Sequence, residues 1–121
     1  MDNFLSIPDS KILYKSIHFF IIKDSYPVSP GHLLIISHEL VNDYFNLSSE
    51  AKHELPSLID KAKKLIEVNY EPDGFNLGMN CGEAAGQTVM HFHCHVIPRY
   101  AGDMDEPRGG IRHCVQGKGY Y

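Results

Sequence analysis

The chain has 121 residues, of which 43% are hydrophobic and 21% are charged, and its formal net charge at pH 7 is -4. That length supports one modest hydrophobic core, so we predict a single domain over residues 1–121. The negative charge and the scattered Lys and Arg residues argue against a nucleic-acid duplex as a partner. No apolar segment is long enough to cross a bilayer, and the start lacks a basic region followed by an apolar run. We therefore expect a cytoplasmic protein with no membrane partner.

The first third of the chain predicts three strands. Residues 11–15 and 18–23 are rich in β-branched and aromatic side chains and are separated by a short polar link, which favours a hairpin. Residues 24–31 contain two prolines and a glycine, which end the strand and force a loop. Residues 32–37 then resume as a third apolar strand.

A long amphipathic helix is predicted to follow, after a shorter turn at residues 39–45. Ser48 or Ser49 supplies the N-cap, and the helix is expected to end near Tyr70. Pro56 falls inside this segment and is expected to bend the helix, because it removes one backbone hydrogen bond. The apolar residues that recur at intervals of three and four are Leu55, Leu58, Ile59, Ala62, Leu65 and Ile66.

Two more strands complete the predicted sheet. Residues 75–80 form the fourth strand, residues 81–86 form a loop of small residues, and residues 89–97 form the fifth strand. Strict alternation places Val89, His91, His93 and His95 on one face of the fifth strand and Met90, Phe92, Cys94 and Val96 on the other. We therefore predict an α+β protein in two layers, with the helix on the apolar face of an antiparallel sheet and three imidazoles on the opposite face.

Three cysteines, Cys81, Cys94 and Cys114, are odd in number and widely spaced, which predicts reduced thiols. Cys94 lies between two histidines, where a ligand or a nucleophile is conceivable. Its position in the alternation instead predicts a side chain in the core.

The three imidazoles in register have three interpretations: a solvated polar face, a metal site and a nucleophilic site. Rings at alternate positions are spaced about 7 Å apart, and their mutual repulsion favours partly neutral rings near pH 7. Zinc needs ligands that converge on one point, whereas the outer two rings are about 13 Å apart along the strand. A neutral imidazole is a good nucleophile at phosphorus, and the preceding glycine-containing loop can direct backbone N–H groups toward phosphate oxygens.

The sequence resembles the histidine triad family, whose signature is His-apolar-His-apolar-His followed by two apolar residues. The match runs along residues 91–97 without exception. It extends to residues 27–35, to the loop at residues 80–87 and to Pro98-Arg99. The resemblance implies a five-stranded antiparallel sheet with a long and a short helix, paired as a homodimer.

The resemblance also implies a role for each triad histidine. His93 would attack the α-phosphorus and form a nucleotidyl-histidine intermediate. His91 would orient His93, partly through its backbone carbonyl, and His95 would contact the phosphate and the leaving-group oxygen. His32 matches a fourth histidine that supports the triad, although a satisfied histidine at a strand start is the alternative from the residues alone. The remaining histidines, His18, His38, His53 and His113, are interpreted as surface or structural.

Further positions of the family match fall on substrate-binding residues. The α-phosphate and bridging oxygen would be held by Asn80, Gly86, Gln87 and Thr88, and Gln87 is counted with the catalytic group. Asp24 matches the position that binds the ribose hydroxyls, although an aspartate before Pro27 equally suits a turn cap. Asn80 is likewise open to interpretation as a turn residue. Ile7 and Ile22 match the apolar pocket for the base.

The expected function is a nucleotide hydrolase that cleaves dinucleoside polyphosphates, or related nucleoside 5'-phosphoryl compounds, at the α-phosphate. A phosphoramidase acting on nucleoside phosphoramidates or aminoacyl adenylates is the alternative enzyme. The alternative that is not an enzyme is a non-catalytic nucleotide-binding module. The paired cysteines of the structural zinc site in some family members are missing, so we predict neither a metal nor another cofactor.

The C-terminal segment, residues 108–121, is rich in glycine and carries Arg108, Arg112 and Lys118. One interpretation places it near the active site, where its charge would favour a polyphosphate leaving group. The other has it packing on a partner subunit without touching substrate.

Overall fold

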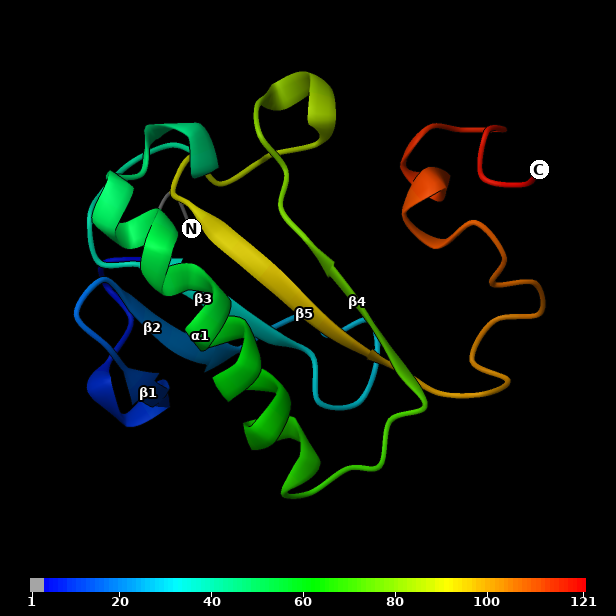
Figure 1. The fold of residues 1–121 in the computed structure, drawn as a ribbon, viewed down its shortest axis with the longest axis horizontal. Helices are drawn as coiled ribbons and strands as arrows, with labels where there is room; N and C mark the ends of the chain where they lie inside the picture. Colours follow the sequence, from blue (N-terminus) through cyan, green and yellow to red (C-terminus); the bar gives the residue numbers. More distant parts are fainter. Residues whose placement is uncertain (1–3) are drawn as a thin grey trace.

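The computed structural model describes residues 4–121, and its centre is one five-stranded sheet (Figure 1). Residues 1–3, on which part of the prediction about the N-terminal start rests, lie outside the described residues. All neighbouring strands are antiparallel, in the order β1-β2-β3-β5-β4. The strands are β1 (Ile12–Lys15), β2 (Phe19–Lys23), β3 (Leu33–Ser37), β4 (Gly74–Gly78) and β5 (His93–Arg99). The predicted fold class is confirmed.

The predicted long helix is α1 (Ser49–Glu67), which covers one face of the sheet. It begins as expected, because the Ser48 hydroxyl accepts a hydrogen bond from the Ala51 amide at 3.1 Å. Pro56 lies within the helix. The helix ends three residues before Tyr70, where the amides of Asn69 and Tyr70 both donate to the Ile66 carbonyl.

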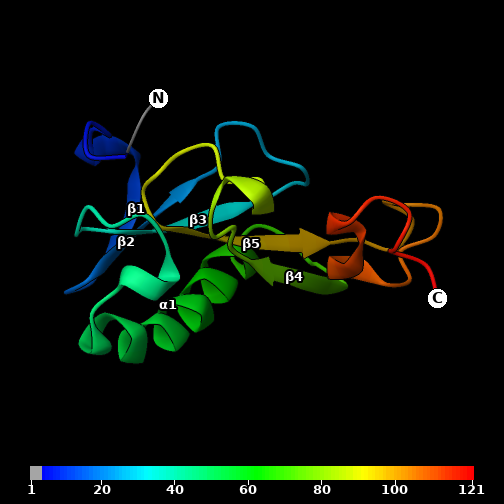
Figure 2. The same cartoon turned by 90° about the horizontal axis from the view of Figure 1, so that it is seen from above.

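The two layers are plain when the molecule is seen from above (Figure 2). On one side of the sheet, α1 packs its buried residues against the alternate side chains of the central strands, including Phe19, Ile35, Cys94 and Val96. The opposite face carries a second, smaller apolar cluster that contains Phe4, Phe20, Ile22, Leu34 and Ile36. The N-terminal segment covers this second cluster, so the face predicted to hold imidazoles is only partly open.

Four short 3-10 helices lie among residues 4–121: one before β1, two in connections between larger elements and one after β5. They are η1 (Asp9–Lys11), η2 (Tyr44–Asn46), η3 (Glu83–Ala85) and η4 (Gly110–Cys114). The turn expected at residues 39–45 is therefore displaced toward α1. Asp43 fixes η2, because its carboxylate accepts from the Phe45 amide at 2.9 Å.

The fifth strand is where the prediction differs most from the structure. The alternation of faces is confirmed for His91 to Val96, but β5 begins at His93 rather than at Val89. The Phe92 amide donates to the Val41 carbonyl, and the Val89 carbonyl accepts from the Gln87 side chain. These backbone groups are therefore bonded outside the sheet. Every predicted end of the other strands lies within two residues of the observed one.

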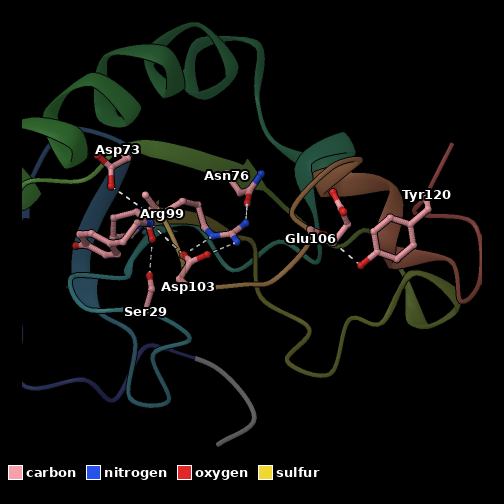
Figure 3. Close-up of polar contacts among 10 residues, drawn as sticks. Ser29, Asp73, Asn76, Arg99, Asp103, Glu106 and Tyr120 are labelled. Carbon is pink, nitrogen blue, oxygen red and sulfur yellow. Dashed lines mark hydrogen bonds and ion pairs between the residues drawn. The ribbon is translucent and has the colours of Figure 1, made fainter.

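A cluster of polar contacts ties the loop after β2 to the far end of β5 (Figure 3). The Ser29 hydroxyl donates to the Pro98 carbonyl at 2.6 Å. Arg99 forms two bonds with Asp103, at 2.8 and 2.7 Å, and a third with Asn76 at 2.6 Å. Hydrogen bonding from Arg99 lowers the pKa of the Asp103 carboxyl to about 2. The loop that carries Ser29 is thus anchored at its middle.

The three cysteines are free thiols. Cys94 is buried in the helix-side core, as predicted, and burial raises the pKa of its thiol to about 11. Such a thiol is inert at neutral pH. Within residues 4–121, no helix has the length and apolar character needed to span a membrane.

Candidate active site

A cavity of about 780 Å³ opens on the face of the sheet away from α1. Its walls come from the N-terminal segment, the ends of β1 and β2, the residues just before β5, and β5 itself. Polar groups at the cavity include Asp24, Thr88, His93 and His95, and apolar groups include Phe4, Ile7, Ile22, Leu34 and Val89. A mostly apolar cleft with a few convergent polar groups is typical of a ligand site.

His93 is held in one orientation by the backbone of the residue two positions before it. Its Nδ1 lies 2.8 Å from the His91 carbonyl oxygen. A carbonyl can only accept, so Nδ1 must carry the proton. In the neutral ring the lone pair is then on Nε2, in a side chain that lines the cavity.

His91 does not line the cavity; it is fully buried, with 0% of its surface exposed. Its Nδ1 accepts from the Phe4 amide at 3.2 Å, and its Nε2 lies 2.7 Å from the Ser37 carbonyl. The ring is therefore neutral, with its proton on Nε2. Burial is the main cause that lowers the pKa of His91, and repulsion from His93 lowers it further. The hydrogen bond to the Ser37 carbonyl opposes these two effects. Of the three imidazoles expected on an open face, that of His91 is therefore buried, and His91 supports His93 through its backbone carbonyl.

His32 and His95 form a direct pair beside Asp24. His32 Nε2 lies 2.9 Å from His95 Nδ1, and the Asp24 carboxylate lies 3.3 Å from the first nitrogen and 3.7 Å from the second. On its other side, His32 Nδ1 accepts from the Val28 amide at 3.2 Å. The structure therefore brings together Asp24, His32 and His95, which the sequence placed just after the second strand, at the start of the third and within the fifth.

Both rings of this pair favour the neutral form. Burial lowers the pKa of His32, and the nearby Asp24 carboxylate opposes that effect. Burial together with repulsion from His93 and His32 lowers the pKa of His95 to about 4, again with Asp24 opposing. At neutral pH, His95 is therefore an uncharged ring.

Asp24, His32 and His95 are also the one group among residues 4–121 whose ligand atoms approach closely enough to hold a cation, with all three atoms within 4.8 Å. A metal on His32 Nε2 would require the proton of that neutral ring to sit on Nδ1. The Val28 amide points its own proton at Nδ1. The donor pattern therefore fits a proton-bearing pair better than a set of metal ligands.

Gln87 is almost fully buried, with 4% of its surface exposed, and its amide is engaged on every side. The carbonyl oxygen accepts from the Gly82 amide at 2.8 Å, and the amino group donates to the carbonyls of Asn42 and Val89 at 2.6 and 3.0 Å. These bonds close the loop that precedes the triad. Gly86 completes the loop in a left-handed conformation, with φ at 93°, that glycine adopts without strain.

The predicted substrate residues divide into two groups. Asp24, Thr88, Ile7 and Ile22 line the cavity together with His93 and His95. The others, Asn80, Gly86 and Gln87, lie in the loop before β5 and are not part of the cavity lining. Two predicted positions outside the site, His38 and His113, bond to the carbonyls of Ser16 and Arg108 and are structural.

Three contributions to the site were missed from the sequence. They are the Phe4 amide on His91, the Val28 amide on His32 and the Ser37 carbonyl on His91. All three are backbone groups, so the residue types in the sequence give no signal for them. Leu34 lies on the same face of the sheet as His95, its register partner in β5.

The C-terminal segment lies beside β4 and contributes no residue to the cavity lining (Figures 1 and 2). The Ile111 side chain comes within 3.9 Å of the position that a Cβ on Gly78 would take, and Gly78 is the register partner of His95. Arg108 and Arg112 place their guanidinium groups over the Tyr121 ring, at 4.7 and 5.0 Å from its centre. A role of this segment in leaving-group choice stays a prediction.

Residues 7–102 match the HIT domain family. This chain belongs to the HIT domain family. The chain is 35% identical over 85 residues to the AP-4-A phosphorylase of Mycobacterium tuberculosis, an alignment that covers 69% of this chain and 44% of the relative. The chain thus spans less than half the length of that protein.

Two solved structures extend this likeness of the HIT domain. The Caenorhabditis elegans NitFhit protein has 30% sequence identity and a TM-score of 0.76, over 89% of this chain and 26% of that one. A zinc-bound histidine triad family protein from Mycobacterium smegmatis has 30% identity and a TM-score of 0.70, over 78% of this chain and 69% of that one. Both contain a domain that superposes on the sheet and helix described above.

Proposed function

We propose that this HIT domain is a nucleotide hydrolase that cleaves dinucleoside polyphosphates, or related nucleoside 5'-phosphoryl compounds, at the α-phosphate. The observation that carries the proposal is the bond from His93 Nδ1 to the His91 carbonyl, which leaves a lone pair on Nε2 in a ring at the cavity. The name AP-4-A phosphorylase of the M. tuberculosis relative supports a dinucleoside polyphosphate substrate.

The proposed reaction has two displacements at phosphorus. First, the His93 Nε2 lone pair forms a P–N bond, and the P–O bond to the leaving group breaks with its electron pair remaining on oxygen. Water then attacks the same phosphorus, the P–N bond breaks, and its electron pair returns to Nε2. The water oxygen enters the nucleoside monophosphate, and one proton is released to solvent.

The proposal gives the surrounding residues supporting roles. The Thr88 hydroxyl and the loop that contains Asn80 and Gly86 bind phosphate oxygens, and Ile7 and Ile22 contact the base. His95 contacts the leaving-group oxygen, and Asp24 binds the ribose hydroxyls. Gln87 acts by shaping the loop, because its own donors are already bonded to backbone carbonyls. No metal ion takes part, and we further propose a cytoplasmic homodimer.

The decisive experiment incubates the protein with diadenosine tetraphosphate and, separately, with adenosine 5'-phosphoramidate, in the presence of a strong chelator. Products are separated by charge. We expect adenosine monophosphate from the tetraphosphate, and we expect His93→Ala to abolish turnover while nucleotide binding stays within about tenfold. Release of adenosine diphosphate only when inorganic phosphate is added would indicate a phosphorylase instead.

The same experiment distinguishes the alternatives. Faster turnover of the phosphoramidate would identify a phosphoramidase with the same nucleophile. Binding without turnover of either substrate would favour a nucleotide-binding module. Activity that disappears with the chelator and returns with zinc would contradict the metal-free mechanism.

A further inference from the structure

The Asp24 carboxylate makes contacts within the protein that the proposed binding of ribose does not require. Its side chain is 13% exposed. One carboxylate oxygen, Oδ1, accepts from the Tyr26 amide at 2.8 Å, and the other, Oδ2, faces the His32–His95 pair. A carboxylate that faces one buried and one partly buried imidazole influences where their protons sit.

The positions of those protons follow from counting donors. The Val28 amide donates to His32 Nδ1, which favours the proton of the neutral His32 ring on Nε2, the nitrogen that lies 3.3 Å from Asp24 Oδ2. That N–H is directed between His95 Nδ1, at 2.9 Å, and Asp24 Oδ2, at 3.3 Å. His95 Nδ1 must therefore be an acceptor, which leaves the single proton of neutral His95 on Nε2.

We propose that Asp24 is a positioning residue that acts through His32 to hold His95 in its Nε2–H tautomer. In this form His95 presents a hydrogen-bond donor to the oxygen on which negative charge develops as the P–O bond breaks. The alternative tautomer of His95 would set two N–H groups against each other across 2.9 Å. This inference rests on the proposed function for its catalytic consequence, although the tautomer itself does not depend on any substrate.

The carboxylate is suited to this task because it accepts hydrogen bonds and never donates them when ionised. It attracts the His32 proton to Nε2 from one side, while the Val28 amide excludes a proton from Nδ1 on the other. An amide in place of the carboxylate would offer either a weaker acceptor or a competing donor. The charge, and not the shape, of Asp24 is therefore the property to remove.

The variant Asp24→Asn removes the charge and keeps an oxygen that accepts from the Tyr26 amide. Asp43→Asn is a matched control, because Asp43 accepts from the Phe45 amide in the same way, at 2.9 Å, and does not line the cavity. Long-range ¹H–¹⁵N NMR spectra of the imidazoles report which nitrogen carries the proton. We expect a pure Nε2–H signal for His95 in the unaltered protein and in Asp43→Asn, and mixed tautomers in Asp24→Asn. An unchanged His95 signal in Asp24→Asn would overturn the inference.

Kinetics then separate the two roles of Asp24. Each variant is assayed with diadenosine tetraphosphate and with the analogue that lacks the 2' and 3' hydroxyls. We expect Asp24→Asn to lower kcat by about tenfold or more on both substrates, because His95 does not contact ribose in the proposed mechanism. A loss that vanishes with the dideoxy analogue would show that Asp24 serves ribose alone. If the unaltered protein hydrolyses neither substrate, the proposed function fails while the NMR result still decides the tautomer.

Discussion

At the scale of single residues, backbone groups, together with the Asp24 carboxylate, set the tautomers of the histidines. The Phe4 and Val28 amides donate to Nδ1 of His91 and His32, and the His91 carbonyl accepts from Nδ1 of His93. Each contact has only one possible direction, so each ring is left with one defined tautomer. The tautomers of these histidines are thus fixed by contacts within the protein itself.

Gln87 provides a test at this scale. In Gln87→Ala, the Gly82 amide and the carbonyls of Asn42 and Val89 lose their partner, which is expected to cost about 1–3 kcal/mol of the free energy of unfolding. Urea unfolding measures this loss, with Gln116→Ala as a control at an exposed glutamine. Unchanged stability combined with lost turnover would show that Gln87 touches the substrate directly.

At the scale of elements, the start of α1 offers two adjacent serines for comparison. Ser48 caps the helix through its hydroxyl, whereas Ser49 is exposed and is the first helical residue. We expect Ser48→Ala to lower the free energy of unfolding by about 1 kcal/mol, and Ser49→Ala to leave it nearly unchanged. Equal effects of the two changes in urea unfolding would argue against the cap.

The elements also show how far the sequence could predict the fold and the site. Alternation correctly separated His93 and His95 from Cys94 and Val96, because an extended backbone points successive side chains to opposite faces of the sheet. It misplaced the start of β5, since the Phe92 amide bonds to the distant Val41 carbonyl and the Gln87 side chain occupies the Val89 carbonyl. For the same reason, the amides that fix the histidine tautomers were not predictable.

At the scale of the whole molecule, three histidines with lowered pKa values couple stability to pH. His32, His91 and His95 bind a proton more weakly when folded than when unfolded, so acid favours the unfolded chain. The free energy of unfolding is expected to be free of this penalty above about pH 6.5 and to fall toward pH 4. At pH 4, the lowered pKa of His95 alone is expected to reduce the free energy of unfolding by about 3 kcal/mol.

Thermal unfolding between pH 7.5 and pH 4 measures this decline. His53→Asn is the control, because His53 is exposed on α1 and is not part of the cavity lining. A melting temperature that stays constant or rises between pH 6.5 and pH 4.5 would contradict the assignment of neutral, buried imidazoles.

The proposed covalent intermediate on His93 can be trapped and identified by mass spectrometry. The protein is mixed in excess with diadenosine tetraphosphate, quenched in alkali, which preserves P–N bonds, and digested for mass spectrometry. We expect an adenylate on the peptide that contains His93, formed and lost at the rate of turnover and absent from His93→Ala. Turnover with no adduct on His93, or an adduct that persists in His93→Ala, would contradict it.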